Sequence, residues 1–223
     1  KNIITIKKYK NIINHIHIDN FLIWAMLGII IGGRLGYILF YNFSFYINSP
    51  IKILYVWQGG MSFHGGLIGI TISMLLFTIK NNLKFLSFTD LICAAAPIGI
   101  FLGRISNFLN GELWGKESSL PWAIVFKCAG TTSRHPSQLY ESFLEGIIIF
   151  SVLYYCIFKL NFLNKPGKVS GLFCILYASS RIIIEFFREP DRHIGLIYSY
   201  FTMGMFLSIP ILLIGIYLCL HKK

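Results

Sequence analysis

Six apolar stretches, each close to the length that spans a lipid bilayer, recur along these 223 residues and restrict the possible folds. A helix needs about 20 residues to cross the hydrocarbon core, whereas a typical strand has only about 5 or 6. Backbone N–H and C=O groups inside lipid must also find partners within the protein, which requires helices. We therefore predict an all-α polytopic membrane protein, a single integral membrane domain over residues 1–223 with six transmembrane helices. The stretches are 21–40, 62–79, 88–108, 138–158, 170–187 and 197–220.

The composition agrees with a membrane protein and argues against a nucleic-acid-binding one. Hydrophobic residues make up 55% of the chain and charged residues 13%, where a soluble protein has about 25% charged residues. The formal net charge is +11, but Lys and Arg lie between the apolar stretches and form no basic face. Eleven of them fall on the side of the N-terminus and six on the other side. By the positive-inside rule, segment 1–20 is cytoplasmic and loop 109–137 is periplasmic.

The residue types that bind metals show no motif. The five cysteines are scattered and lie mostly within apolar stretches, which indicates neither a disulfide framework nor a CxxC metal site. The carboxylates and His64 lack a recognisable ligand spacing, and the paired aspartates that hold Mg²⁺ in lipid-headgroup transferases are absent from the sequence. We therefore expect no metal and no soluble cofactor.

Ionisable side chains inside the apolar stretches are the strongest functional signal. Placing one there costs at least about 2.5–3.5 kcal/mol, so such residues are by default functional and have partners. Arg104 and Arg181 lie near the aqueous edges of two separate stretches, and two guanidinium forks from different helices suit a phosphate better than a metal. The predicted ligand is therefore a phospholipid headgroup. The ionisable residues inside these stretches or at their ends are Arg34, His64, Asp90, Arg104, Glu141, Glu145, Arg181, Glu185 and Arg188.

The stretch "GRISNFLNGELWG" (residues 103–115) places amide and carboxylate groups directly after Arg104. Amide and carboxylate oxygens accept hydrogen bonds from guanidinium groups and from hydroxyls. We expect Asn107, Asn110 and Glu112 to orient the guanidiniums of Arg104 and Arg181, which we call the arginine clamp. We also expect them to bind the headgroup hydroxyls.

Two further stretches admit a structural and a functional interpretation. In "RHPSQLYESFLEG", Glu141 and Glu145 lie one helical turn apart, where they either cap and join helices or act in the site. In "YASSRIIIEFFREPD", spacings of 4, 4 and 3 place four polar side chains on one helix face. That face either contributes to the site or is an internal ladder of ion pairs. Its members are Tyr177, Arg181, Glu185 and Arg188.

His64 stands among five glycines in "GGMSFHGGLIG", which lets backbone or a ligand approach the imidazole. It either bridges two helices structurally or acts as a base beside the arginines. The chain has no GxSxG nucleophile elbow, which excludes a serine hydrolase. Elsewhere, Gly28, Gly32 and Gly36 at four-residue spacing predict a close helix contact.

Five stretches together closely resemble the bacterial phosphatidylglycerol–prolipoprotein diacylglyceryl transferases: "GGRLGYILFYN", "GGMSFHGGLIG", "GRISNFLNGELWG", "RHPSQLYE" and "RIIIEFFREPD". The resemblance runs from Gly32 to the C-terminus, and the stretch 103–115 is the family signature. It implies an enzyme of the bacterial inner membrane that moves a diacylglyceryl group from phosphatidylglycerol to the lipobox cysteine of a prolipoprotein and releases glycerol phosphate. The family has seven membrane helices, and we expect this chain to lack the first, with its site tyrosine.

The resemblance also implies which residues act. The essential histidine of the family corresponds to His64, and its two essential arginines to Arg104 and Arg181, which we expect to be catalytic. Its signature asparagine, glutamate and final glycine correspond to Asn107, Glu112 and Gly115. The expected substrate-binding set is Arg104, Asn107, Asn110, Glu112, Gly115, Tyr177, Glu185 and Arg188.

The predicted reaction forms a thioether at the glycerol carbon that bears the phosphate. His64 would take the thiol proton, and the two arginines would stabilise the charge on the departing phosphate. The partners are then phosphatidylglycerol, a prolipoprotein lipobox peptide and membrane lipid, and no nucleic acid. The alternative is an anion- or lipid-conducting channel or transporter lined by the same arginines. Transporters commonly show paired repeats, and none is found in this sequence.

Overall fold

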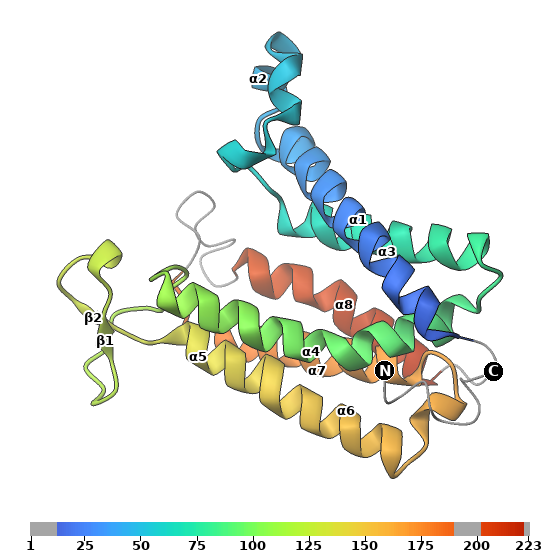
Figure 1. The fold of residues 1–223 in the computed structure, drawn as a ribbon. Helices are drawn as coiled ribbons and strands as arrows, with labels where there is room; N and C mark the ends of the chain where they lie inside the picture. Colours follow the sequence, from blue (N-terminus) through green and yellow to red (C-terminus); the bar gives the residue numbers. More distant parts are fainter. Residues whose placement is uncertain (1–12, 190–201, 221–223) are drawn as a thin grey trace. The chain divides into compact units, whose positions relative to one another are not determined.

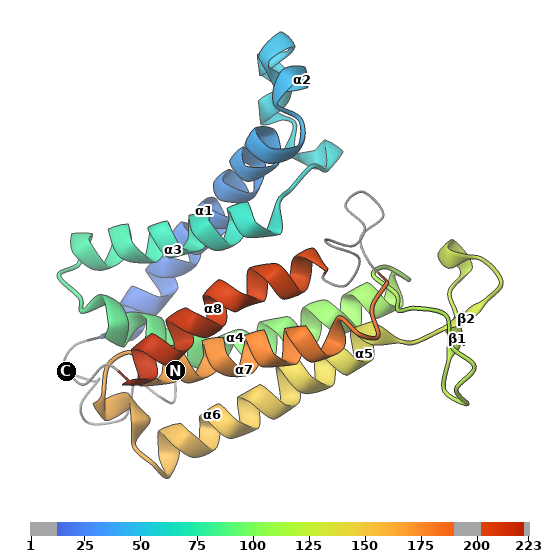
Figure 2. The same ribbon diagram turned by 180° about the vertical axis from the view of Figure 1, so that it is seen from behind.

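The structure is a computed structural model that describes residues 13–189 and 202–220. Most of the expected segment 1–20, the loop beyond residue 189 and residues 197–201 of the last apolar stretch lie outside the described part. The chain forms two compact units, Lys1–Phe88 and Thr89–Lys223 (Figures 1 and 2).

The first unit consists of two long helices joined by a loop of short helical turns. The helices cross each other (Figure 1) and cover the apolar stretches predicted at 21–40 and 62–79, whose helical structure is thereby confirmed. The elements are α1 (His15–Tyr41), α2 (Phe43–Asn48), the 3-10 turns Pro50–Leu54 and Val56–Gln58, and α3 (Phe63–Lys80).

Glycines let α1 and α3 approach until their backbones touch. A Cβ atom added at Gly36 would lie 2.7 Å from the Cα of Gly65, and one added at Gly28 would lie 2.7 Å from the carbonyl oxygen of Gly69. Such contacts are closer than side chains allow, so the crossing depends on small residues on both helices. The close contact predicted from the glycine spacing in α1 is confirmed, and its partner is a pair of glycines on α3.

Arg34 organises the loop between these helices. Its guanidinium is buried and donates hydrogen bonds to five backbone carbonyls at 2.6–3.2 Å. It also lies 5.1 Å from the centre of the Tyr46 ring. A buried charge must be paired or hydrogen-bonded, and here the backbone supplies the partners. The carbonyls belong to Lys52, Ile53, Tyr55, Gly59 and Gly60.

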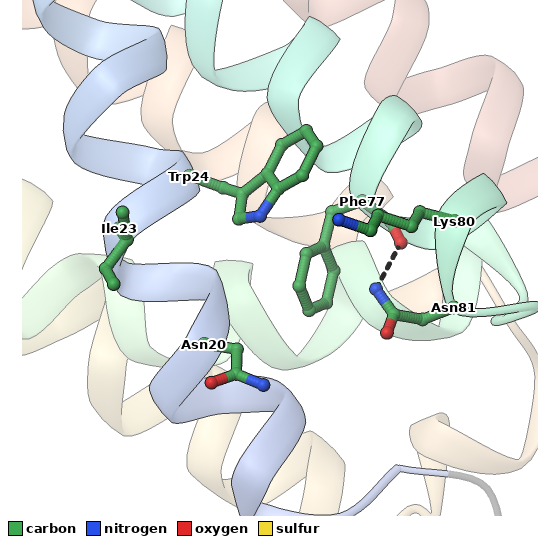
Figure 3. A pocket seen from close by; sticks show the side chains of 6 residues that line it. All are labelled: Asn20, Ile23, Trp24, Phe77, Lys80 and Asn81. Carbon is green, nitrogen blue, oxygen red and sulfur yellow. Dashed lines mark hydrogen bonds between the residues drawn. The ribbon is translucent and has the colours of Figure 1, made fainter.

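Aromatic rings pack the other end of α1 and α3. The rings of Phe21, Phe77 and Phe88 are buried, with centres 4.9–5.4 Å apart. Beside them, an open pocket is lined by side chains of both helices (Figure 3), and the ammonium of Lys80 lies 5.5 Å from the Trp24 ring. Tryptophan and lysine at a helix end are typical of the membrane–water interface.

In the second unit, α6, α7, α8 and the part of α4 from Thr89 onward run side by side (Figure 2). They cover the apolar stretches predicted at 88–108, 138–158 and 170–187 and the described part of 197–220, so these four are helical as expected. The elements are α4 (Phe85–Leu109), β1 (Ile124–Val125), a 3-10 turn (Lys127–Ala129), β2 (Ser133–Arg134), α5 (Ser137–Glu141), a π-helix (Ser142–Ile148), α6 (Ile149–Phe158), a 3-10 turn (Phe162–Asn164), α7 (Lys168–Ile184) and α8 (Met203–Leu220).

A buried carboxylate and two glycines join three of these helices. Asp90 in α4 accepts hydrogen bonds at 2.8 Å from the backbone N–H groups of Gly167 and Ser170, and so caps the first turn of α7. α8 packs on α7 at Gly171 and Gly215, where a Cβ atom added to either would lie within 2.9 Å of the other's carbonyl oxygen. The partner of Asp90 is therefore a helix terminus.

The loop predicted at 109–137 contains a small antiparallel ribbon that the sequence analysis did not predict. Strands β1 and β2 pair with Ile124 opposite Arg134 and Val125 opposite Ser133. Each strand has only two residues, which is too short for an alternating apolar pattern to be visible. The ribbon adds a little β-structure to a chain that is otherwise helical.

Four helical segments in the described part are long and apolar enough to cross a membrane: His15–Tyr41, Phe85–Leu109, Ser137–Phe158 and Met203–Leu220. α3 has 18 residues and α7 has 17, and α7 also carries the polar face predicted above. The structure is thus that of an all-α multi-pass membrane protein, while the count of six spans stays a prediction.

We predict that Gly65→Ala destabilises the first unit while Gly66→Ala, one residue further along α3, does not. The Cβ atom at position 65 would overlap the backbone of Gly32 and lie 2.9 Å from the Cα of Gly36. Such overpacking costs about 1–3 kcal/mol. At position 66 the nearest atoms are 3.7 Å away, in Ile29. Thermal unfolding in detergent measures both, and equal midpoints for the two variants would contradict this account of the crossing.

Candidate active site

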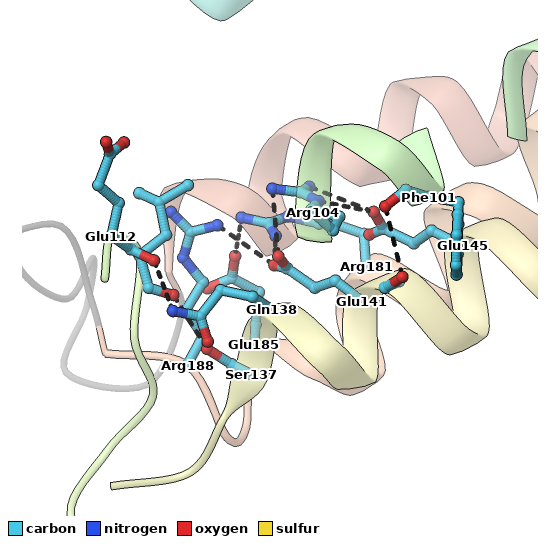
Figure 4. Close-up of polar contacts among 12 residues, drawn as sticks. Phe101, Arg104, Glu112, Ser137, Gln138, Glu141, Glu145, Arg181, Glu185 and Arg188 are labelled. Atoms are coloured by element: carbon cyan, nitrogen blue, oxygen red, sulfur yellow. Dashed lines mark hydrogen bonds and ion pairs between the residues drawn. The ribbon is translucent and has the colours of Figure 1, made fainter. Parts of the chain in front are cut away.

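Three arginines and three glutamates form one polar network in the second unit (Figure 4). The arginine side chains are 9–16% exposed and the glutamate side chains at most 4%. Their formal charges balance, as buried ions require. We call these six residues the arginine–glutamate network; they are Arg104 of α4, Glu141 of α5, Glu145 of the π-helix, Arg181 of α7, and Glu185 and Arg188 just after α7.

Glu141 is the centre of this network. Its Oε1 accepts hydrogen bonds from Nη1 of Arg181 at 2.5 Å and from Nη1 of Arg188 at 3.3 Å. Its Oε2 lies 3.1 Å from Nη1 of Arg104. One fully buried carboxylate therefore pairs with guanidiniums from α4 and from the end of α7. From the sequence, Glu141 was expected either to cap and join helices or to act in the site, and it was not in the expected substrate-binding set.

A π-helical turn brings a second carboxylate to Arg104. Oε2 of Glu145 accepts from Nη2 of Arg104 at 3.2 Å and from Nε at 3.4 Å. In the same turn, a Cβ atom added at Gly146 would lie 2.7 Å from the Cβ of Phe101 in α4, so the two segments are in close contact. π-helical turns are rare and often occur at functional sites. All three kinds of nitrogen in the Arg104 guanidinium thus face carboxylates.

The sequence left open an internal ladder of ion pairs along α7, and the structure contains one of these pairs. Nη2 of Arg181 lies 2.6 Å from Oε1 of Glu185. Arg188 pairs with Glu141 of another helix, so the ladder extends into the network. The first turn of α8 covers the Arg181–Glu185 pair: a Cβ atom added at Gly204 would lie 2.7 Å from Cδ of Glu185. A side chain at this position would have to displace the Glu185 carboxylate.

Hydrogen bonds from α5 hold the signature stretch 103–115 beside the network. Nε2 of the buried Gln138 donates to the carbonyl of Glu112 at 2.5 Å, and Oγ of Ser137 donates to the carbonyl of Leu113 at 3.0 Å. The Glu112 carboxylate is exposed and points away from the arginines (Figure 4). Asn107 is half-buried on the last turns of α4, and Asn110 follows it at the surface.

Gly115 lies where three chain segments meet. Its N–H donates to the carbonyl of His135 at 3.0 Å, and an added Cβ atom would lie 2.6 Å from the carbonyl oxygen of Phe187. The buried Arg134 holds this crossing, because its Nη1 donates to the carbonyl of Gly115 and pairs with Glu189, both at 3.2 Å. The structure therefore explains the glycine by backbone contact, and Arg134 is a supporting residue that the sequence analysis missed.

Tyr177 and His64 are two further residues of the expected site. Tyr177 is half-buried on α7, one turn before Arg181, with its ring stacked on Phe173 at 5.9 Å between centres. His64 is half-buried on the first turn of α3 in the first unit, two residues after Ser62, whose Oγ caps that helix by accepting from the N–H of Gly65. Of the ten predicted site residues, the structure joins Arg104, Arg181, Glu185 and Arg188 in one network.

This network can bind an anion. The guanidiniums of Arg104 and Arg181 present forked donors that match phosphate oxygens. Their side chains are 16% and 14% exposed, so part of each fork is accessible. Within residues 13–189 and 202–220, no three His, Cys, Asp or Glu side chains are grouped as a metal site. The three glutamates of the arginine–glutamate network face arginines.

Residues 3–221 match the family described as prolipoprotein diacylglyceryl transferase. A protein of Sinorhizobium medicae is 51% identical over 205 residues, 92% of this chain and 73% of its own length. One of Brucella anthropi is 50% identical over 90% of this chain and 72% of its length, and one of Agrobacterium fabrum is 50% identical over 93% and 74%. All three are named phosphatidylglycerol–prolipoprotein diacylglyceryl transferase. This chain belongs to the prolipoprotein diacylglyceryl transferase family.

Proposed function

We propose that this chain transfers the diacylglyceryl group of phosphatidylglycerol to the cysteine thiol of a prolipoprotein lipobox, forms a thioether and releases glycerol phosphate. The names of its relatives give the two substrates. The observation that carries the chemistry is the pair Arg104 and Arg181, which come from different helices and share one carboxylate. Family membership favours this enzyme over the channel or transporter considered above.

The arginines suit the phosphodiester of phosphatidylglycerol. This group carries one negative charge before the reaction, and the departing glycerol phosphate gains charge as its C–O bond breaks. Forked guanidinium donors fixed in a water-poor site stabilise such charge, and in well-studied sites one donor contributes about 3–4 kcal/mol. Arg104 and Arg181 are therefore the proposed catalytic arginines, and Arg188 supports them from the same network.

The reaction balances without a soluble cofactor. The cysteine sulfur attacks the glycerol carbon that bears the phosphate, the C–S bond forms, and the C–O bond breaks with its electron pair on the phosphate oxygen. The thiol proton must leave, and the thiolate is the nucleophile. His64 is the proposed base, since imidazole titrates nearest to neutrality among side chains.

The remaining site residues have proposed roles in holding substrate. Asn107, Asn110 and the signature loop at Glu112 and Gly115 would line the approach to Arg104. Tyr177 and Glu185 flank Arg181 on α7, and Glu185 fixes it by the ion pair at 2.6 Å. These residues would bind the headgroup and orient the phosphate against the arginines.

The proposed location is the bacterial inner membrane, with six spans in this chain, a single transferase domain over 1–223, a cytoplasmic segment 1–20 and a periplasmic loop 109–137. The charge bias of the loops supports this orientation. The lipobox peptide and the membrane lipid would then meet the signature stretch on the periplasmic side.

Reconstitution tests the proposed function. The purified chain is placed in vesicles of labelled phosphatidylglycerol with a synthetic lipobox peptide. Transfer requires both a peptide heavier by one diacylglyceryl group and release of glycerol phosphate in equal amount. Movement of anions or lipid across the vesicle without either product would indicate the channel or transporter.

We predict that Arg104→Lys lowers kcat/KM by about 100-fold or more, although the charge is kept. Lysine is a point charge and cannot make the forked contact with two phosphate oxygens. The control is Lys52→Ala, because the Lys52 ammonium lies over the exposed ring of Phe45 in a loop of the first unit. Product formation in the vesicle assay measures both, and near-normal turnover in Arg104→Lys would refute forked phosphate binding.

We predict that His64→Gln lowers kcat by about 100-fold with unchanged affinity for phosphatidylglycerol, and that raising the pH restores part of the rate. A free thiol has a pKa of about 8.5, so thiolate forms without a base as the pH approaches that value. The control is His15→Gln, an exposed histidine on the first turn of α1. If the variant and the wild type have parallel rate–pH profiles, or if the loss is in lipid affinity, His64 is not the base.

A further inference from the structure

We infer that Glu141 is a positioning residue that fixes the guanidiniums of Arg104 and Arg181 at the separation the phosphodiester requires. The inference rests on the proposed function of the arginines. Glu141 is 0% exposed, so it does not reach substrate and acts through the arginines that it holds.

The ion pairs set Glu141 apart from the other glutamates of the network. Among the described residues, Glu145 pairs with Arg104 and Glu185 pairs with Arg181. Glu141 pairs with both arginines, through Oε2 at 3.1 Å and through Oε1 at 2.5 Å. It is thus the direct link between the guanidinium of α4 and the guanidinium of α7.

The surroundings make this link rigid. Glu141 ends α5, directly before the π-helical turn, and Arg188 adds a third guanidinium to its Oε1 at 3.3 Å. Gln138, one turn earlier on the same helix, is fully buried and bonded to the signature stretch. The Glu141 carboxylate is therefore fixed on its buried side. Arg104 and Arg181 each keep an exposed edge for the phosphate.

Two variants separate the effect of losing a negative charge from the effect of losing the link between Arg104 and Arg181. Glu141→Gln and Glu145→Gln both remove one negative charge from a balanced network and keep the size of the side chain. Both should therefore bind the phosphatidylglycerol anion as well as the wild type or better. Only Glu141→Gln removes the link between the two arginines.

The experiment measures kcat and KM in vesicles of phosphatidylglycerol diluted with phosphatidylcholine, with a lipobox peptide in excess. For Glu141→Gln we expect an equal or lower KM for phosphatidylglycerol and a kcat lower by about 100-fold, the size of effect that a misplaced catalytic group produces. For Glu145→Gln we expect the same direction in KM and a loss in kcat below about 10-fold. Transfer by the wild type in these vesicles tests the proposed function separately.

Two results would overturn the inference. One is an equal loss of kcat in the two variants, which would make charge alone responsible. The other is a raised KM with unchanged kcat in Glu141→Gln, which would assign it to ground-state binding. If Glu141→Gln does not fold, Glu141→Asp tests the inference, because aspartate keeps the charge and shortens the link between the arginines. For Glu141→Asp, kcat should fall by about 10-fold or more at an unchanged melting temperature. A wild-type kcat in this variant would refute the positioning role.

Discussion

The carboxylate of Glu141, buried among three guanidiniums, is the interaction on which the second unit depends. An ion in a membrane protein keeps its charge only when partners replace water. Here α4, α5 and α7 must meet at one carboxylate to supply them. The π-helical turn and the close contact at Gly146 bring these elements together, and Gly204 of α8 packs against the carboxylate of Glu185 beside them. Removing one partner would leave a charge buried without compensation, which is far more costly than never burying the pair.

The ionisable residues of the apolar stretches fall into two groups by their partners. Arg34 bonds to the backbone carbonyls of a loop, and Asp90 bonds to backbone N–H groups and the Ser170 hydroxyl in the first turn of α7. These hydrogen bonds join parts of the backbone and stabilise the fold. Arg104 and Arg181 bond to other side chains and keep an exposed edge. That difference marks them as the residues which can exchange or share partners with a bound anion.

Much of the fold could be predicted from the sequence because lipid imposes simple rules. Length and apolar composition located the helices, and glycines at four-residue spacing located the close face of α1. The facing glycines of α3 could not be named, since spacing within one helix does not reveal its neighbour. The ribbon β1–β2 was missed because two-residue strands carry no pattern. α7 has only 17 residues and carries the polar face with Arg181. A helix that contributes polar side chains to a site is therefore harder to recognise as a membrane span from its sequence.

The arginines of the site and the pairing of Arg181 with Glu185 on one helix could be predicted, but the partners from other helices could not. Arg104 and Arg181 stood out because charge is rare in apolar stretches. Glu141 stood out equally but had an adequate local explanation at the start of a helix, and nothing in the sequence tells which helices face one another. The bond from Gln138 to the backbone of Glu112 joins residues 26 apart and is likewise visible only in the fold.

The central claim is that the two guanidiniums of Arg104 and Arg181 hold the phosphate of phosphatidylglycerol directly. Solid-state NMR of the chain with ¹⁵N-labelled arginine, in phosphatidylglycerol bilayers, measures ³¹P–¹⁵N dipolar couplings between bound phosphate and guanidinium nitrogens. The account predicts couplings from one phosphate to both arginines, with the signal of Arg104 lost in the variant where lysine replaces it and that of Arg181 retained. Absence of any phosphate–guanidinium coupling in the wild type, or a spectrum unchanged by that substitution, would contradict it.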